Sequence, residues 1–139
     1  MTMPAGGLLH VNPGRIPPGM ASVNGQFVVP RDYLRPSSVV LRDAVRHPRR
    51  VQYAVPAQYR AAACALTHPG TTLTGFGALA LYGLPYLADA HDVVLIAPKN
   101  RMKKLGGQFS PTLTRQPLGP GETWNVVCRG EPIQVAAPA

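Results

Sequence analysis

Apolar residues are concentrated in one stretch near the middle of the chain, which carries no Asp, Glu, Lys or Arg from Ala61 to Ala88. Within it, the segment from Thr71 to Pro85 predicts a short helix that Thr74 caps and Gly83 ends. This helix would be apolar on both sides, so we expect other elements to surround it. A His-Pro-Gly and a Gly-Leu-Pro break keep the apolar run shorter than the ~20 residues that a bilayer requires. We therefore expect no membrane span.

The pattern before this stretch predicts two further helices. The first would begin at Pro36-Ser37-Ser38 and end at His47-Pro48, because the residue before a proline avoids the helical region. The second would begin at Pro56 and end at His68-Pro69-Gly70. In the first helix the expected inward residues are Val40, Leu41, Ala44 and Val45, and the expected outward residues are Arg42, Asp43 and Arg46.

Alternating or continuous apolar runs predict strands on both sides of the helices. The predicted strands are residues 25–30, 51–55, 92–97, 109–116, 123–128 and 132–137. We expect the last three to form an antiparallel meander. The mixture of helical and extended periods is typical of an α/β (α+β) fold with short helices and a mixed or antiparallel sheet of about four strands.

Composition divides the chain into three parts. Residues 1–19 hold four Pro and four Gly, so we expect a disordered leader, and Met20 is an alternative start. Residues 20–56 would form a reduced winged-helix-like segment, and residues 57–139 an α/β domain.

The charge balance favours a polyanionic partner. The chain has 14 Lys and Arg against 6 Asp and Glu, a net charge of +8, which points to nucleic acid ahead of an anionic membrane surface. Cys64 and Cys128 lie far apart in apolar surroundings, which is typical of buried, reduced thiols. With no secretory signal at the N-terminus, we expect a cytoplasmic protein.

Two groups of cationic residues are candidate phosphate contacts. The first surrounds the end of the first predicted helix and the strand after it, and the second lies in one loop. Few aromatic residues alternate with these cations, which argues against a single-strand stacking platform. The alternative is a solvated basic surface with a solubilising loop. The candidate DNA-binding residues are Arg42, Arg46, Arg49, Arg50, Lys99, Arg101, Lys103 and Lys104.

Enzymatic motifs are scarce. His91-Asp92 is similar to the dipeptide that ligates metal in phosphohydrolases, but partner ligands at useful spacing are missing, so a polar entry to the next strand is the preferred interpretation. Glu122 and Glu131 fall in predicted turns rather than forming an acid and base pair. We expect no catalytic residues, no metal and no cofactor.

Three consecutive segments carry a resemblance to a known family: LTGFGALALYGLP, the strand DVVLIAP, and TLTRQPLGPGETWNVVCRGEPIQVAAPA after a basic segment. From about Val51 to Ala139 the chain resembles the actinobacterial branch of AbiEi-family antitoxins of type IV toxin–antitoxin systems. The resemblance implies a transcriptional regulator with an N-terminal winged helix-turn-helix that binds its own promoter. It also implies a toxin as a possible protein partner.

The chain departs from the family pattern at both ends. Residues 20–53 leave room for one helix where a winged helix needs three, although Arg49-Arg50-Val51-Gln52-Tyr53 matches the family's basic wing. The family's C-terminal continuation is absent, which implies a truncated version without nuclease activity.

We therefore expect a non-enzymatic, DNA-binding regulator of antitoxin type that contacts the backbone of double-stranded DNA. One alternative is a protein-binding scaffold or orphan domain whose basic loop meets an acidic partner. The other is a metal-dependent phosphohydrolase that uses His91-Asp92.

Overall fold

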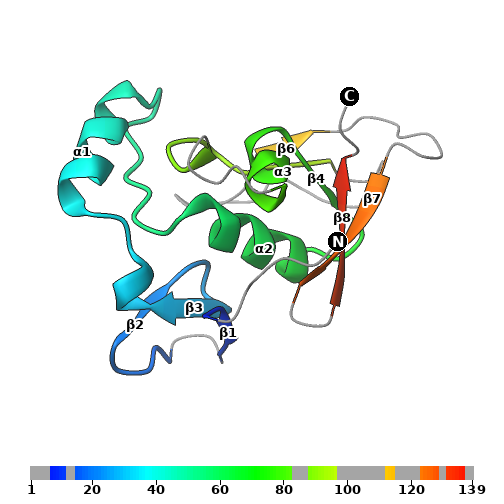
Figure 1. The fold of residues 1–139 in the computed structure, drawn as a ribbon, viewed down its shortest axis with the longest axis horizontal. Coiled ribbons are helices and arrows are strands. Elements are labelled where there is room, and N and C mark those ends of the chain that lie inside the picture. Colours follow the sequence, from blue (N-terminus) through cyan, green and yellow to red (C-terminus); the bar gives the residue numbers. More distant parts are fainter. Residues whose placement is uncertain are drawn as a thin grey trace.

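The computed structural model describes residues 7–11, 15–82, 88–96, 112–114, 123–128 and 131–136. Within them the fold is α+β, as the sequence predicts (Figure 1). The helices are α1 (Ser37–Arg46), α2 (Ala57–Thr67) and α3 (Gly75–Leu81), with a short 3-10 helix at Arg31–Tyr33. The strands are β1 (Leu9–His10), β2 (Met20–Ser22), β3 (Phe27–Pro30), β4 (Thr72–Thr74), β5 (Val94–Ile96), β6 (Thr112–Thr114), β7 (Thr123–Cys128) and β8 (Glu131–Ala136).

The first sheet is antiparallel and has the order β1-β3-β2. Its edge strand β1 comes from the segment that we expected to be disordered. Leu9 pairs with Val28 and His10 with Phe27, and the preceding Leu8 is buried in the core. The expectation of disorder is thus wrong for residues 7–11, because burial of Leu8 and pairing with β3 offset the effect of the surrounding Pro and Gly residues.

The second sheet is mixed and has the order β6-β5-β4-β8-β7. β7 and β8 form the expected antiparallel hairpin, but β8 then runs parallel to β4, and β6 runs parallel to β5 at the opposite edge. The predicted meander is therefore wrong. Alternation identifies a strand but not its partner, and here β4 and β5 lie between β6 and the hairpin.

Helix α2 lies between the two sheets and holds the core together (Figure 1). Ala61, Ala62 and Ala63 are fully buried, and their small side chains let both sheets approach the helix closely. One continuous apolar cluster joins Phe27 of the first sheet, α2 and Val135 of the second sheet. Helix α3 packs beside α2, as the central apolar pattern predicts.

Residues 51–55 form no strand and belong to neither sheet, so the predicted strand is wrong. The predicted alternation of burial is correct, since Val51, Tyr53 and Val55 are buried and Gln52 is exposed. Arginines make the hydrogen bonds that a neighbouring strand would otherwise make. The Arg35 guanidinium donates to the carbonyl oxygen of Tyr53, and the backbone N–H of Arg35 donates to the carbonyl oxygen of Ala54. The carbonyl of Val55 accepts from Arg60 in the same way.

In the part of the chain that the structure describes, no helix combines the length and the apolar character that crossing a bilayer would need.

Candidate nucleic-acid interface

Helix α1 stands apart from both sheets (Figure 1), and its exposed residues are both apolar and basic. Val40 and Ala44 are buried as predicted, whereas Leu41 is 53% and Val45 65% exposed. The predicted inward face is thus too wide, because α1 packs along one narrow line instead of being covered by a second element. Two apolar side chains therefore lie on the surface next to the arginines of the same helix.

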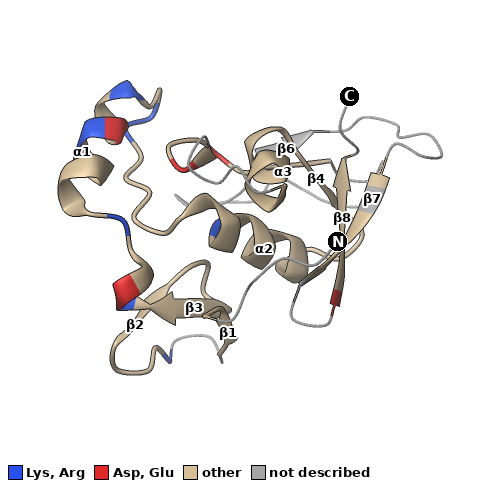
Figure 2. Cartoon of the chain, in the orientation of Figure 1, with Lys and Arg blue, Asp and Glu red and all other residues tan. Residues whose placement is uncertain are grey.

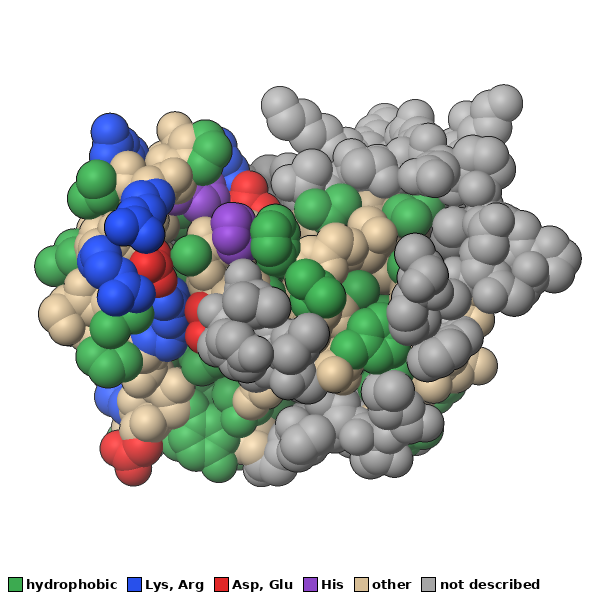
Figure 3. Space-filling model, turned by 45° about the horizontal axis from the view of Figure 1, so that its top comes forward, with side chains coloured by type: hydrophobic (Ala, Val, Ile, Leu, Met, Phe, Trp, Pro, Cys, Tyr) green, Lys and Arg blue, Asp and Glu red, His purple; other side chains and the backbone are tan. Residues whose placement is uncertain are grey.

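The four arginines of the first predicted group are exposed and lie close together (Figure 2). Arg42 and Arg46 belong to the second half of α1, and Arg49 and Arg50 to the turn that follows. Figure 3 shows Lys and Arg side chains gathered on this side of the molecule, next to histidine and hydrophobic side chains. The second predicted group, Lys99, Arg101, Lys103 and Lys104, lies outside the described residues.

Carboxylates balance only part of this charge. Arg42 contacts Asp43 at 3.2 Å, and Arg49 contacts Asp92 at 2.8 Å. Arg50 donates to the carbonyl oxygen of Val45 at 2.6 Å. The side chain of Arg46 makes no ion pair or hydrogen bond with any described residue. The cluster therefore keeps a net positive charge that faces solvent.

Asp92 fixes the turn that carries Arg49. Its Oδ1 accepts hydrogen bonds from Nε2 of His47, at 2.8 Å, and from the Tyr53 hydroxyl, and its Oδ2 accepts from Arg49. Nδ1 of His47 accepts from the backbone N–H of Arg49 at 3.0 Å, so the ring proton lies on Nε2. Burial raises the pKa of Asp92, but the three donors outweigh it and the pKa is lowered overall.

Arg35 ties α1 to the same region. Its guanidinium bridges Asp43 of α1 and the Asp89 backbone, donating to the Asp89 carbonyl at 3.2 Å. The hydrogen bond from Arg35 lowers the pKa of Asp43. Asp89 in turn accepts from the backbone N–H of Ala57 at 2.8 Å, a favourable place for a carboxylate at the first turn of α2. The cationic surface thus rests on a rigid support.

Arg50 has a positive φ of 57°, a conformation that costs a residue with a Cβ atom about 1 kcal/mol. We predict that Arg50→Gly keeps the free energy of unfolding or raises it by up to about 1 kcal/mol, because glycine adopts this conformation freely. Arg50→Ala loses the bond to Val45 but keeps the strain, so it should be the less stable variant. Urea unfolding of both proteins tests this, and a less stable Gly variant would contradict the assignment of strain.

His91 and Asp92 are the two residues that the phosphohydrolase alternative names as metal ligands. The His91 ring stacks on Phe76, with centroids 3.7 Å apart and planes 5° apart, while Asp92 serves His47, Tyr53 and Arg49. The described residues contain no group of three or more His, Cys, Asp or Glu placed to hold a metal ion. Asp92 acts here as a structural acceptor, which agrees with the preferred interpretation of a polar strand entry.

A separate groove of about 500 Å³ lies between the end of α2 and the β7–β8 hairpin. Its lining is mixed, with apolar residues such as Leu66 and Ile133 beside the polar Asn125 and Gln134 and the acidic Glu131. Cys64 is buried in the core, as predicted, and burial raises the pKa of its thiol to about 11. The side chain of Cys128 lies outside the described residues.

Sequence reasoning grouped the arginines correctly because they are neighbours in the chain. It missed the Asp92 cluster and the exposed Phe76–His91 stack, because their members come from segments about 15 to 45 residues apart and no local spacing connects them. Comparison with protein-family models, with curated proteins and with solved structures finds no match for this chain.

Proposed function

We propose that this chain is a non-enzymatic, DNA-binding regulator of antitoxin type that holds the backbone of duplex DNA with α1 and the turn after it. The observation that supports this proposal is the exposed group of Arg42, Arg46, Arg49 and Arg50, which carboxylates only partly neutralise. The antitoxin role rests on the family resemblance of residues 51–139.

The chemistry of the group suits phosphate. Guanidinium groups donate in a planar fork that matches phosphate oxygens, and a protruding helix can follow a groove while its flanks meet the backbone. Asp92 and His47 hold Arg49 in place before any ligand arrives, so less side-chain freedom is lost on binding. Arg46 is free to meet a phosphate without first breaking an ion pair to a described residue.

We predict that Arg42→Ala combined with Arg46→Ala weakens binding to all DNA sequences and flattens the dependence of log affinity on log salt by about two units. Fluorescence anisotropy with a labelled duplex from the gene's own upstream region, and with a scrambled duplex, measures this at several salt concentrations. Better binding to the native duplex that persists at high salt would support a sequence-reading regulator.

The matched control is Arg15→Ala combined with Arg31→Ala, which removes the same charge from exposed positions near the first sheet. This control should change the salt slope much less. Equal slopes for the two double variants would contradict a phosphate site on α1, because only the net charge would then matter.

The exposed Leu41 and Val45 favour a second candidate, an acidic protein partner. Its apolar residues would cover this pair while its carboxylates meet the neighbouring arginines. This function predicts co-purification with a protein, negligible DNA affinity at physiological salt, and loss of the partner in a Leu41→Ser, Val45→Ser variant.

A further inference from the structure

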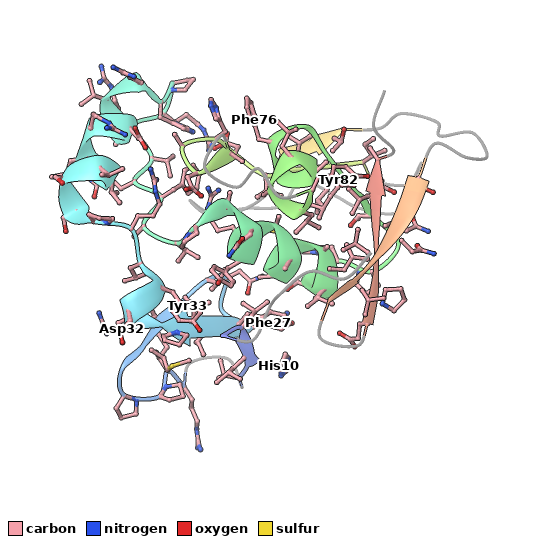
Figure 4. All side chains as sticks on the ribbon, viewed as in Figure 1. His10, Phe27, Asp32, Tyr33, Phe76 and Tyr82 are labelled. Atoms are coloured by element: carbon pink, nitrogen blue, oxygen red, sulfur yellow. The ribbon has the colours of Figure 1, made fainter. Side chains whose placement is uncertain are left out.

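An aromatic pair lies on the surface beside the arginine group. Phe76, in the first turn of α3, is 38% exposed, and the His91 ring that stacks on it is exposed as well. Figure 4 shows the Phe76 side chain projecting away from α3. Part of the Phe76 ring is buried against His91, and the rest of the ring remains in contact with solvent.

The backbone connects the Phe76–His91 pair to the arginine group. His91 directly precedes Asp92, whose Oδ2 accepts from the exposed guanidinium of Arg49 at 2.8 Å. The backbone of His91 is held firmly, because its carbonyl accepts from buried Arg60 at 2.9 Å and its N–H donates to Ala88 at 3.0 Å. The backbone that carries the His91 ring is therefore held in place. Its neighbour in the chain, Asp92, binds Arg49, which is the candidate phosphate contact.

We propose that the Phe76–His91 pair receives an unpaired nucleobase, which extends the stack while the adjoining phosphate meets Arg49. This inference rests on the proposed function and deepens it, since it names a single-stranded feature of the nucleic acid. Every base has a flat π-face, so stacking of this kind tolerates any sequence. The imidazole of His91, which makes no hydrogen bond to another described residue, adds a polar edge that a base or phosphate can contact.

Few aromatic residues alternate with the cations along the sequence, and the Phe76–His91 pair comes from segments that the sequence pattern does not connect with them. Phe76 was expected to lie within a surrounded helix, and its distance along the chain from Arg49 hid the arrangement. The folded chain brings one aromatic surface to the edge of the arginine group, which is the combination that single-strand binding proteins use.

Three probes separate stacking from phosphate contact: a labelled oligodeoxythymidine, an abasic strand of the same length, and a blunt duplex. The wild-type chain should bind the thymidine strand about tenfold more tightly than the abasic strand, because both carry the same phosphates and only one carries bases. Phe76→Leu should remove most of this difference while leaving binding to the abasic strand and the duplex within about twofold. Phe76→Tyr, which keeps the aromatic face, should restore it.

The matched control is Tyr33→Leu, which removes another exposed aromatic side chain, 40% exposed and in contact with Tyr59, on the other side of α2 (Figure 4). It should leave the preference for thymidine unchanged. Equal wild-type affinity for the thymidine and abasic strands would overturn the inference, and so would an equal loss in the Tyr33 variant. Failure of wild-type protein to bind the duplex or the abasic strand at low salt would instead overturn the proposed phosphate site.

Discussion

Replacing Arg60 by Met should lower the free energy of unfolding by about 3 kcal/mol. Arg60 is 5% exposed, and its guanidinium donates to three carbonyl oxygens: Val55 at 2.9 Å, Asp89 at 2.8 Å and His91 at 2.9 Å. Methionine fills a similar volume but leaves these acceptors without a donor. Burial lowers the pKa of Arg60 to about 10, so the group stays charged at neutral pH and its removal recovers part of the burial cost.

The Arg60→Lys variant should recover only part of the loss, because a single ammonium group cannot reach three carbonyls on two chain segments. Lysine would also lose the stacking of the guanidinium on Tyr53, which lies 3.9 Å from the ring centroid. Urea unfolding measures each free energy, and Arg46→Met, at an exposed position of α1, is the control that should change it by less than about 0.5 kcal/mol. A loss below about 1 kcal/mol for Arg60→Met would contradict the assignment of a stabilising role to these three hydrogen bonds.

Arg60 also shows why part of this fold could not be predicted from the sequence. In the sequence, Arg60 lies among alanines, and this position predicts only one charged residue within an apolar helix. In the folded chain its guanidinium binds the backbone carbonyls of Val55, Asp89 and His91, which come from two segments outside α2. Every residue carries a backbone carbonyl, so the pattern of side chains in the sequence does not predict such a contact.

The features that were predicted correctly depend on local signals. Pro36 and Pro56 fix the starts of α1 and α2, and His47 and His68 follow their last residues, as the breakers after them indicate. The β7–β8 hairpin follows from alternation around one turn. Pairing across the sheet depends instead on contacts between distant segments, so the strand that contains β6 was predicted but its pairing with β5 was not. The arginine site could be predicted in part for the same reason: its cations are close in sequence, and its supporting Asp92 is not.

Replacing Asp92 by Asn should lower the free energy of unfolding by about 2–3 kcal/mol at pH 7. Three donors point at its two carboxylate oxygens, from His47, Tyr53 and Arg49. Asparagine offers one oxygen and an NH₂ group, so at least one donor meets another donor in either orientation. Tyr53 is a buried residue, and burial, with this hydrogen bond to Asp92, raises the pKa of its hydroxyl.

The decrease in the free energy of unfolding caused by Asp92→Asn should depend on pH. The folded-state pKa of Asp92 lies below its unfolded value of about 3.9, so the carboxylate stabilises the fold above that value. This contribution disappears as the pH falls through the folded-state pKa, because the folded chain then takes up the proton. The stabilities of wild-type protein and the Asp92→Asn variant should therefore converge as the pH falls below about 4 and through the folded-state pKa of Asp92.

Urea unfolding at pH 7, 5, 4 and 3 measures this convergence. Asp32→Asn, at an exposed position of the 3-10 helix, removes the same charge and should change stability by less than about 0.5 kcal/mol at pH 7 (Figure 4). A constant difference between wild-type and Asp92→Asn at every pH would contradict the assignment, because a carboxylate that binds cationic and neutral donors must lose its advantage once it is protonated. Convergence would show that Asp92 stabilises the turn of Arg49 through its charge, and that the cationic surface depends on a partly buried anion for its shape.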